Sequence, residues 1–178
     1  DYEVILVDDC SKDGTFEKLT AKCKEYRGFK AYQMPKNGGP GPARNFGLSK
    51  AEGEYILFCD CDDRFDISCL DKIEALLKLH PDADIIVSPH LIVRSNKTTT
   101  ADVYSKYGDG DRMTAEDVVT GYGGPVAKVY RRDIILENGI EFPARMTGED
   151  ACFVANYAVF VKNAYKLAFP YYSYMMND

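Results

Sequence analysis

The sequence has few of the residues and patterns that several classes of protein require. It holds two histidines among 178 residues, and its six cysteines form no CxxC pair, so a zinc site of the cysteine–histidine type is not indicated. No dense block of lysine and arginine occurs and the formal net charge is -6, which argues against a protein that grips a nucleic-acid backbone. Its longest apolar runs stop well short of the roughly 20 residues that a membrane-spanning helix needs.

The composition that remains is typical of one globular domain. Hydrophobic residues make up 46% of the chain and charged residues 28%, and the length is enough to bury a core. We expect the cysteines to be reduced and mostly buried, as in a cytosolic protein. Because the chain starts at Asp1 rather than methionine and enters a strand at once, we expect it to be a fragment of a longer protein.

Strand-like and helix-like patterns alternate through the first half of the chain. Short β-rich runs occupy residues 3–7, 30–35, 53–60 and 83–93, and helical spacing of apolar residues occupies 16–26, 43–51 and 67–79. After Arg94 we expect an excursion or hairpin, then a short helix opened by a capping box of Thr114 and Asp117, a strand and helix over 124–140, a helix from 147 and a final strand over 165–174. The alternation predicts an α/β fold, a three-layer α/β/α sandwich with a mainly parallel sheet.

Acidic residues gather where two of the predicted strands end. Asp8 and Asp9 follow the first strand, and residues 60–63 follow the third. In open α/β sheets ligands bind beyond the carboxyl ends of the strands, and clustered carboxylates repel unless a cation such as Mg²⁺ or Mn²⁺ neutralises them. A solvated turn followed by a helix cap is the alternative for either cluster.

The segment "FCDCDD" alternates cysteine and aspartate. In a strand Cys59 and Cys61 share one face, while Asp60 and Asp62 share the other. We therefore expect the two cysteines to pack into the core and the two aspartates to carry the chemistry.

Three stretches carry a resemblance to a known family. "VILVDDCSKDGT", "NGGPGPARNFGLSKAEGEYILFCDCDD" and "KVYRRDIILENGIEFP" followed by "GED" resemble the inverting, GT-A-fold glycosyltransferases of family 2, which include bacterial surface-polysaccharide enzymes. The resemblance implies metal-dependent transfer of a sugar from a nucleoside diphosphate to an acceptor hydroxyl, in cell-surface polysaccharide or lipid-linked glycan synthesis. It also implies a cytoplasmic protein, at the inner face of the membrane. The family's usual first strand and helix, of the type "VSVIIPVYN", are missing, so we expect an N-terminally truncated catalytic domain.

The resemblance also implies roles for particular residues and parts of the chain. Residues 1–94 would form the nucleotide-sugar-binding part and residues 95–178 the acceptor side. The implied roles are Asp9 at the nucleotide base with Asp8 supporting its loop, Arg44 in the donor pocket, Asp60 near ribose and metal, Asp62 as the most direct ligand of Mn²⁺ or Mg²⁺, and Asp150 as general base with Glu149 beside it. The implied partners are a nucleotide-diphospho-sugar donor and a glycan or lipid-linked acceptor, with no nucleic acid and with membrane association only through regions outside this sequence.

Other interpretations stay open from the sequence. "ILVDD" is also typical of a phospho-acceptor receiver domain, although no counterpart of that domain's later lysine is evident. A phosphatase with an Asp-x-Asp nucleophile would have Thr or Val soon after its second aspartate, where this chain has Asp63 and Arg64. A catalytically silent sugar-nucleotide-binding domain is a third alternative. Asp150 by itself is better explained as a cap at a helix start, and it is the preceding segment "KVYRRDIILENGIEFP" that favours a catalytic role.

Overall fold

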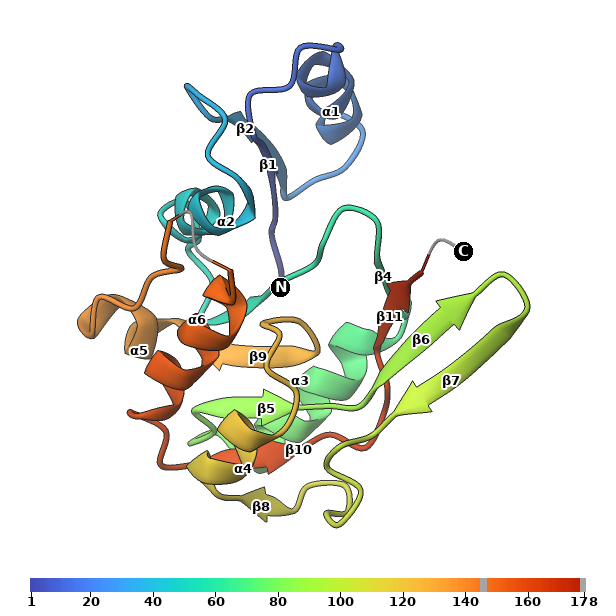
Figure 1. The fold of residues 1–178 in the computed structure, drawn as a ribbon, viewed down its shortest axis with the longest axis vertical. Helices are drawn as coiled ribbons and strands as arrows, with labels where there is room; N and C mark the ends of the chain where they lie inside the picture. The colour runs from blue at the N-terminus through green and yellow to red at the C-terminus, as the bar shows by residue number, and fades with distance from the viewer. Residues whose placement is uncertain (145–146, 177–178) are drawn as a thin grey trace. The chain divides into compact units, whose positions relative to one another are not determined.

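The structure, a computed structural model, describes residues 1–144 and 147–176 (Figure 1). The chain forms two compact units. The first unit comprises residues 1–54 and 141–153, and the second comprises residues 55–140 and 154–178. Within the described ranges, no helix is both long enough and apolar enough to cross a bilayer.

The first unit is built on two parallel strands. Strand β1 (Val4–Asp8) pairs with β2 (Phe29–Gln33). Parallel neighbours need a crossover between them, and helix α1 (Thr15–Cys23) supplies it and packs on both strands. Helix α2 (Pro40–Leu48) packs on β1.

The second unit contains two sheets. The larger has the strand order β3-β9-β5-β10-β8, and the smaller has the order β4-β11-β6-β7. The strands of the larger sheet are β3 (Tyr55–Leu57), β5 (Ile85–Val87), β8 (Arg112–Met113), β9 (Lys128–Arg131) and β10 (Ala164–Lys166). The strands of the smaller sheet are β4 (Arg64–Phe65), β6 (His90–Arg94), β7 (Lys97–Ala101) and β11 (Tyr172–Met175). The helices of this unit are α3 (Cys69–Leu79), α4 (Ala115–Thr120), α5 (Arg132–Glu137) and the second half of α6. Helix α6 spans Glu149–Ala158, and its residues 154–158 belong to this unit.

Both faces of the larger sheet are buried. On one face, Tyr130 of β9 meets the ring of Tyr157 from α6, with ring centroids 4.9 Å apart. On the other face, Tyr165 of β10 stacks at 3.9 Å on His80, the residue that follows α3. Consecutive residues of β5 are all fully buried, although successive side chains in a strand point to opposite faces. The sheet is thus covered on both sides, as the predicted three-layer arrangement requires.

The predicted α/β class is confirmed, and the sheets are more mixed than expected. Parallel pairing occurs in β1–β2, β5–β10 and β6–β11, but β9 runs antiparallel to both of its neighbours, β3 and β5. The expected strand over residues 83–93 is divided at Ser88 and Pro89 into β5 and β6, because proline has no N–H to donate to a ladder. The hairpin expected after Arg94 is the β6–β7 pair.

The local helix signals are confirmed where the structure describes them. The Thr114 hydroxyl accepts a hydrogen bond from the Asp117 amide at 3.1 Å, which caps α4 as the capping-box pattern predicts. The strand and helix predicted over 124–140 are β9 and α5, and the helix predicted from residue 147 is α6.

We predict that Tyr157→Phe lowers the free energy of unfolding by about 1–3 kcal/mol. The buried Tyr157 hydroxyl donates to the Asp84 carbonyl at 2.6 Å and accepts from the Arg131 amide at 2.9 Å. Phenylalanine removes both hydrogen bonds and leaves these two backbone groups only the 2.9 Å bond between them. Urea denaturation measures the change. The control Tyr2→Phe alters a ring that is 60% exposed and should stay within about 0.5 kcal/mol of wild type. Equal unfolding midpoints for the two variants would contradict the prediction.

Candidate functional site

Asp8 is a buried carboxylate at the end of β1. Its side chain accepts hydrogen bonds from the Ser11 amide at 3.1 Å and from the Gln33 side-chain amide at 2.9 Å. These hydrogen bonds hold the pKa of Asp8 below its ordinary value. Asp8 therefore ties the loop after β1 to strand β2 as an ionised group.

Asp9 holds the glycine-rich loop that precedes α2. One oxygen of its carboxylate accepts from the Gly38 amide at 2.8 Å and the other from the Gly39 amide at 2.7 Å. The Asn37 side chain also donates to the Asp9 carbonyl at 3.1 Å. Gly39 has φ +86° and ψ 180°, a conformation that is essentially restricted to glycine. Two loops that lie 29 residues apart in the sequence are thereby joined through one carboxylate.

Arg44 and Asp150, which the sequence places in separate motifs, meet in the first unit. The Arg44 guanidinium forms an ion pair with the Asp150 carboxylate at 2.6 Å and lies over the Phe142 ring, 5.3 Å from its centroid. Asn45 is bonded to both backbone groups of Phe142, donating to its carbonyl at 2.9 Å and accepting from its amide at 2.8 Å. The Phe142 ring stacks on Phe153 of α6 at 3.9 Å. These contacts attach the start of α6 to α2.

Asn45 is a site residue that sequence reasoning missed. It directly follows Arg44 in the segment "ARN", but an asparagine in a helix has many ordinary uses. The sequence does not show its two hydrogen bonds to the backbone of Phe142, because the two positions lie 97 residues apart.

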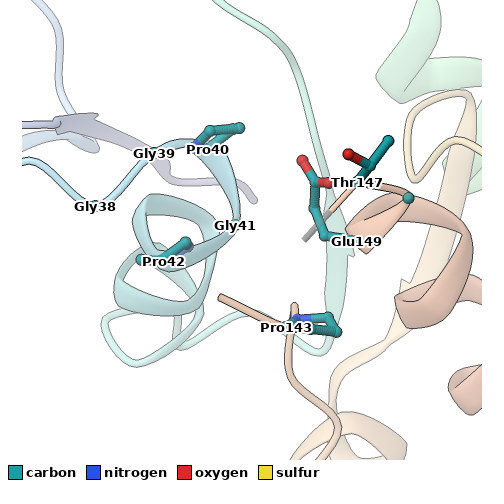
Figure 2. Close-up of a pocket in the computed structure, with 9 residues that line it drawn as sticks. Gly38, Gly39, Pro40, Gly41, Pro42, Pro143, Thr147 and Glu149 are labelled. Atoms are coloured by element: carbon teal, nitrogen blue, oxygen red, sulfur yellow. The ribbon is translucent and has the colours of Figure 1, made fainter. Parts of the chain in front are cut away.

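A cavity of about 440 Å³ lies in the first unit, and its lining includes Thr147, Gly148 and Glu149, the residues directly before Asp150 in the sequence. Figure 2 shows the side chains of Thr147 and Glu149 facing the segment from Gly38 to Pro42 that begins α2, with Pro143 below them. Gly41 permits this arrangement, since a Cβ there would lie 3.2 Å from the Pro143 carbonyl oxygen. The cavity thus has glycine and proline on one wall and a carboxylate and a hydroxyl on the other, a lining able to accept hydrogen bonds from ligand hydroxyl groups.

Residues 60–63 form a turn in the second unit, which we name the acidic turn. The Asp63 amide donates to the Asp60 carbonyl at 3.1 Å and closes it. Strand β3 ends at Leu57, so the alternation of faces expected for residues 59–62 is wrong, and Cys59 and Cys61 are exposed instead of packed in the core. All six cysteines lie in the described part of the chain and are free thiols.

Asp60 and Asp62 fit a hard divalent cation by their chemistry. They supply carboxylate oxygens, the ligands that Mg²⁺ and Mn²⁺ prefer, from one short turn in which Asp62 is exposed. Over residues 1–144 and 147–176, no group of three or more His, Cys, Asp or Glu side chains gathers as a metal cluster. Two protein ligands suit Mg²⁺, because it usually keeps several waters and takes phosphate oxygens from its substrate. The binding of Mn²⁺ or Mg²⁺ by Asp60 and Asp62 stays a prediction.

Comparison with known proteins identifies the family. The model of glycosyl transferase family 2 matches residues 1–139, more than three quarters of the chain. The chain belongs to glycosyl transferase family 2. Glu149 and Asp150 lie beyond the matched residues, so this match does not bear on their predicted roles.

Two of the relatives are named as poly(ribitol-phosphate) glycosyltransferases. The chain is 28% identical to the poly(ribitol-phosphate) beta-N-acetylglucosaminyltransferase TarS of Staphylococcus aureus over 86% of this chain and 26% of the relative. It is 31% identical to a poly(ribitol-phosphate) beta-glucosyltransferase of Bacillus spizizenii, over 88% of this chain and 24% of the relative. A crystal structure of S. aureus TarS in complex with UDP-GlcNAc superposes with a TM-score of 0.85 at 27% identity, covering 99% of this chain and 50% of that one.

These relatives are much longer than the chain. It spans about a quarter of the length of the two named transferases, at 26% and 24%, and half of the solved TarS chain, at 50%. Family membership and the α/β fold are therefore shown for this chain, and the activity of the whole protein is a matter for proposal.

We predict that Asp9→Ala frees the glycine loop. Losing both acceptors should speed hydrogen exchange at the Gly38 and Gly39 amides by about tenfold each, the factor expected for loss of one hydrogen bond. Residue-resolved exchange measured by NMR provides the readout. Asp9→Asn keeps one acceptor oxygen, so its exchange rates should fall between those of wild type and Asp9→Ala. Unchanged rates in Asp9→Ala would show that the carboxylate does not hold the loop.

Proposed function

We propose that the chain is the catalytic domain, or most of it, of a glycosyltransferase that moves a sugar from a nucleoside diphosphate to an acceptor hydroxyl. Membership of glycosyl transferase family 2 and the likeness to TarS solved with UDP-GlcNAc support a nucleotide-sugar donor. The structural observation that carries the proposal is the Asp150 carboxylate, held by Arg44 next to Glu149 and its cavity. The predicted division into a donor part over 1–94 and an acceptor part over 95–178 belongs to this proposal.

Asp150 is the proposed general base. An acceptor hydroxyl must lose its proton as it attacks the sugar, and a carboxylate within hydrogen-bond reach takes that proton. The ion pair with Arg44 fixes where the Asp150 carboxylate points, which a base needs before it can act. One displacement with one base inverts the anomeric centre and needs no covalent sugar intermediate. Glu149 extends the acidic wall toward the hydroxyl groups of a bound sugar or acceptor.

The donor-binding roles of the aspartates are consistent with their contacts. A carboxylate has about four acceptor positions, so Asp9 can hold two glycine amides and still accept a hydrogen bond from a nucleotide base. Asp8 supports that loop through Ser11 and Gln33. Arg44 forms an ion pair with Asp150, and we propose that it serves the donor pocket by positioning this carboxylate.

Asp60 and Asp62 are the proposed holders of Mn²⁺ or Mg²⁺. Such an ion would stabilise the negative charge that builds on the departing diphosphate. The residues' own contribution is to present two carboxylates from one closed turn, with Asp62 exposed toward incoming ligand.

The proposed acceptor is a cell-surface polymer or its lipid-linked precursor. Support comes from the two relatives named as poly(ribitol-phosphate) transferases, which act on a polyol phosphate by their names. We place the activity in the cytoplasm at the inner face of the membrane, where nucleotide sugars meet lipid-linked acceptors. Any membrane association through regions beyond this chain is part of the same proposal.

We predict that Asp150→Asn in the full-length protein lowers sugar transfer by about 100-fold or more. The assay follows release of UDP from UDP-GlcNAc and from UDP-glucose, with poly(ribitol phosphate) as the acceptor probe. Binding of UDP should remain, because asparagine has the shape of aspartate and keeps a side-chain oxygen that can accept a hydrogen bond from Arg44. Asp133→Asn, which changes an exposed aspartate of α5, is the matched control and should keep wild-type activity. Near-normal transfer by Asp150→Asn would rule out Asp150 as the base.

We predict that Asp62→Ala weakens metal-dependent binding of UDP by about tenfold or more while binding of uridine persists. Uridine has no phosphates and so needs no cation between ligand and protein. Isothermal titration calorimetry with and without Mn²⁺ measures both, and chelation by EDTA should reproduce the effect in wild type. The control is Asp71→Ala, an exposed aspartate of α3. If wild-type UDP affinity does not change with Mn²⁺, the metal proposal fails.

A further inference from the structure

The acidic turn is tied to β11 at both of its ends. One oxygen of the Asp63 carboxylate accepts from the Met175 amide at 2.8 Å, and the other accepts from the Tyr172 hydroxyl. The same hydroxyl accepts a hydrogen bond from the Asp60 amide at 3.3 Å. A single phenol therefore joins the first and last residues of the turn.

Tyr172, the residue that anchors the acidic turn, is held in place by its surroundings. Tyr172 is fully buried and lies in β11 between β4 and β6, opposite Phe65 in one ladder and His90 in the other. Its ring packs edge-on against Phe65, with centroids 5.8 Å apart.

The anchor contrasts with the segment it holds. No ladder covers residues 58–63 of the described chain, which run between the end of β3 and the start of β4. Such a segment would sample many conformations if its backbone were unrestrained. Both carboxylate oxygens of Asp63 accept hydrogen bonds from β11, so this residue attaches the turn to the strand. Asp62, two positions after Asp60, is exposed.

We propose that Tyr172 and Asp63 are positioning residues, which hold the acidic turn in the shape that its metal- and diphosphate-binding carboxylates need. The proposal deepens the proposed function and rests on it. Residues that orient the ligands of a metal typically change its affinity 10- to 100-fold when they are replaced. Tyr172 and Asp63 would have this effect without contacting the ion.

The first test is local and does not depend on any ligand. Tyr172→Phe in the full-length protein keeps the buried ring and removes only the hydroxyl. Hydrogen exchange at the Asp60 and Asp63 amides should rise by about tenfold, because one loses its acceptor and the other loses the closure of the turn. Tyr174→Phe, on the same strand and 41% exposed, is the matched control and should leave both amides at wild-type rates.

The second test measures the metal directly. Free Mn²⁺ is titrated by electron paramagnetic resonance in the presence of UDP, and Tyr172→Phe should raise the apparent dissociation constant for Mn²⁺ about 10-fold. Asp63→Asn should change it in the same direction, since the amide cannot accept from both donors through two carboxylate oxygens. Uridine binding should stay at the wild-type level in both variants.

The outcomes separate the two proposals. A lower melting temperature of Tyr172→Phe with unchanged Mn²⁺ affinity would mean that the residue is only structural, whether or not the amides exchange faster, and would overturn the inference. Unchanged amide exchange would overturn it independently of any ligand. If wild-type protein binds no Mn²⁺ with UDP, the proposed function fails, whereas the exchange measurement still decides whether Tyr172 holds the turn.

Discussion

Carboxylates held by hydrogen-bond donors from distant segments are the interaction on which the candidate site depends. Asp9 holds the amides of a glycine loop, Asp63 holds a strand amide and a buried phenol, and Asp84 holds the amides of Lys162 and Asn163. A charged group that leaves water is costly unless such donors replace its hydration. Each of these carboxylates therefore holds together two segments that are distant in the sequence, because its hydrogen-bond donors come from the other segment.

This constraint gives neighbouring aspartates different jobs. Asp8 is buried and ties the loop after β1 to β2, whereas Asp9 joins that loop to the glycine-rich loop before α2. In the acidic turn, Asp63 is engaged and Asp62 is exposed. Acidic residues that look equivalent in the sequence thus divide into those whose oxygens hold neighbouring segments and those that are left exposed.

Elements set by local chemistry were predicted well. The crossover between β1 and β2, the Thr114 cap of α4 and the strand and helix β9 and α5 all follow from short-range pattern, turn residues and capping. The expected core positions of Cys59 and Cys61 were wrong because the strand signal does not show where the ladder ends. A ladder ends where its partner strand stops pairing, and β9 pairs with β3 only as far as Leu57.

The sequence by itself determined the α/β class, the family, and which residues could act as acids, bases or ligands. Only the tertiary structure decided their partners: Arg44 with Asp150, 106 residues away, and Asp63 with Tyr172, 109 residues away. Local propensity acts over a few residues, whereas partners at this separation depend on sheet order, strand register and the packing that brings remote segments together.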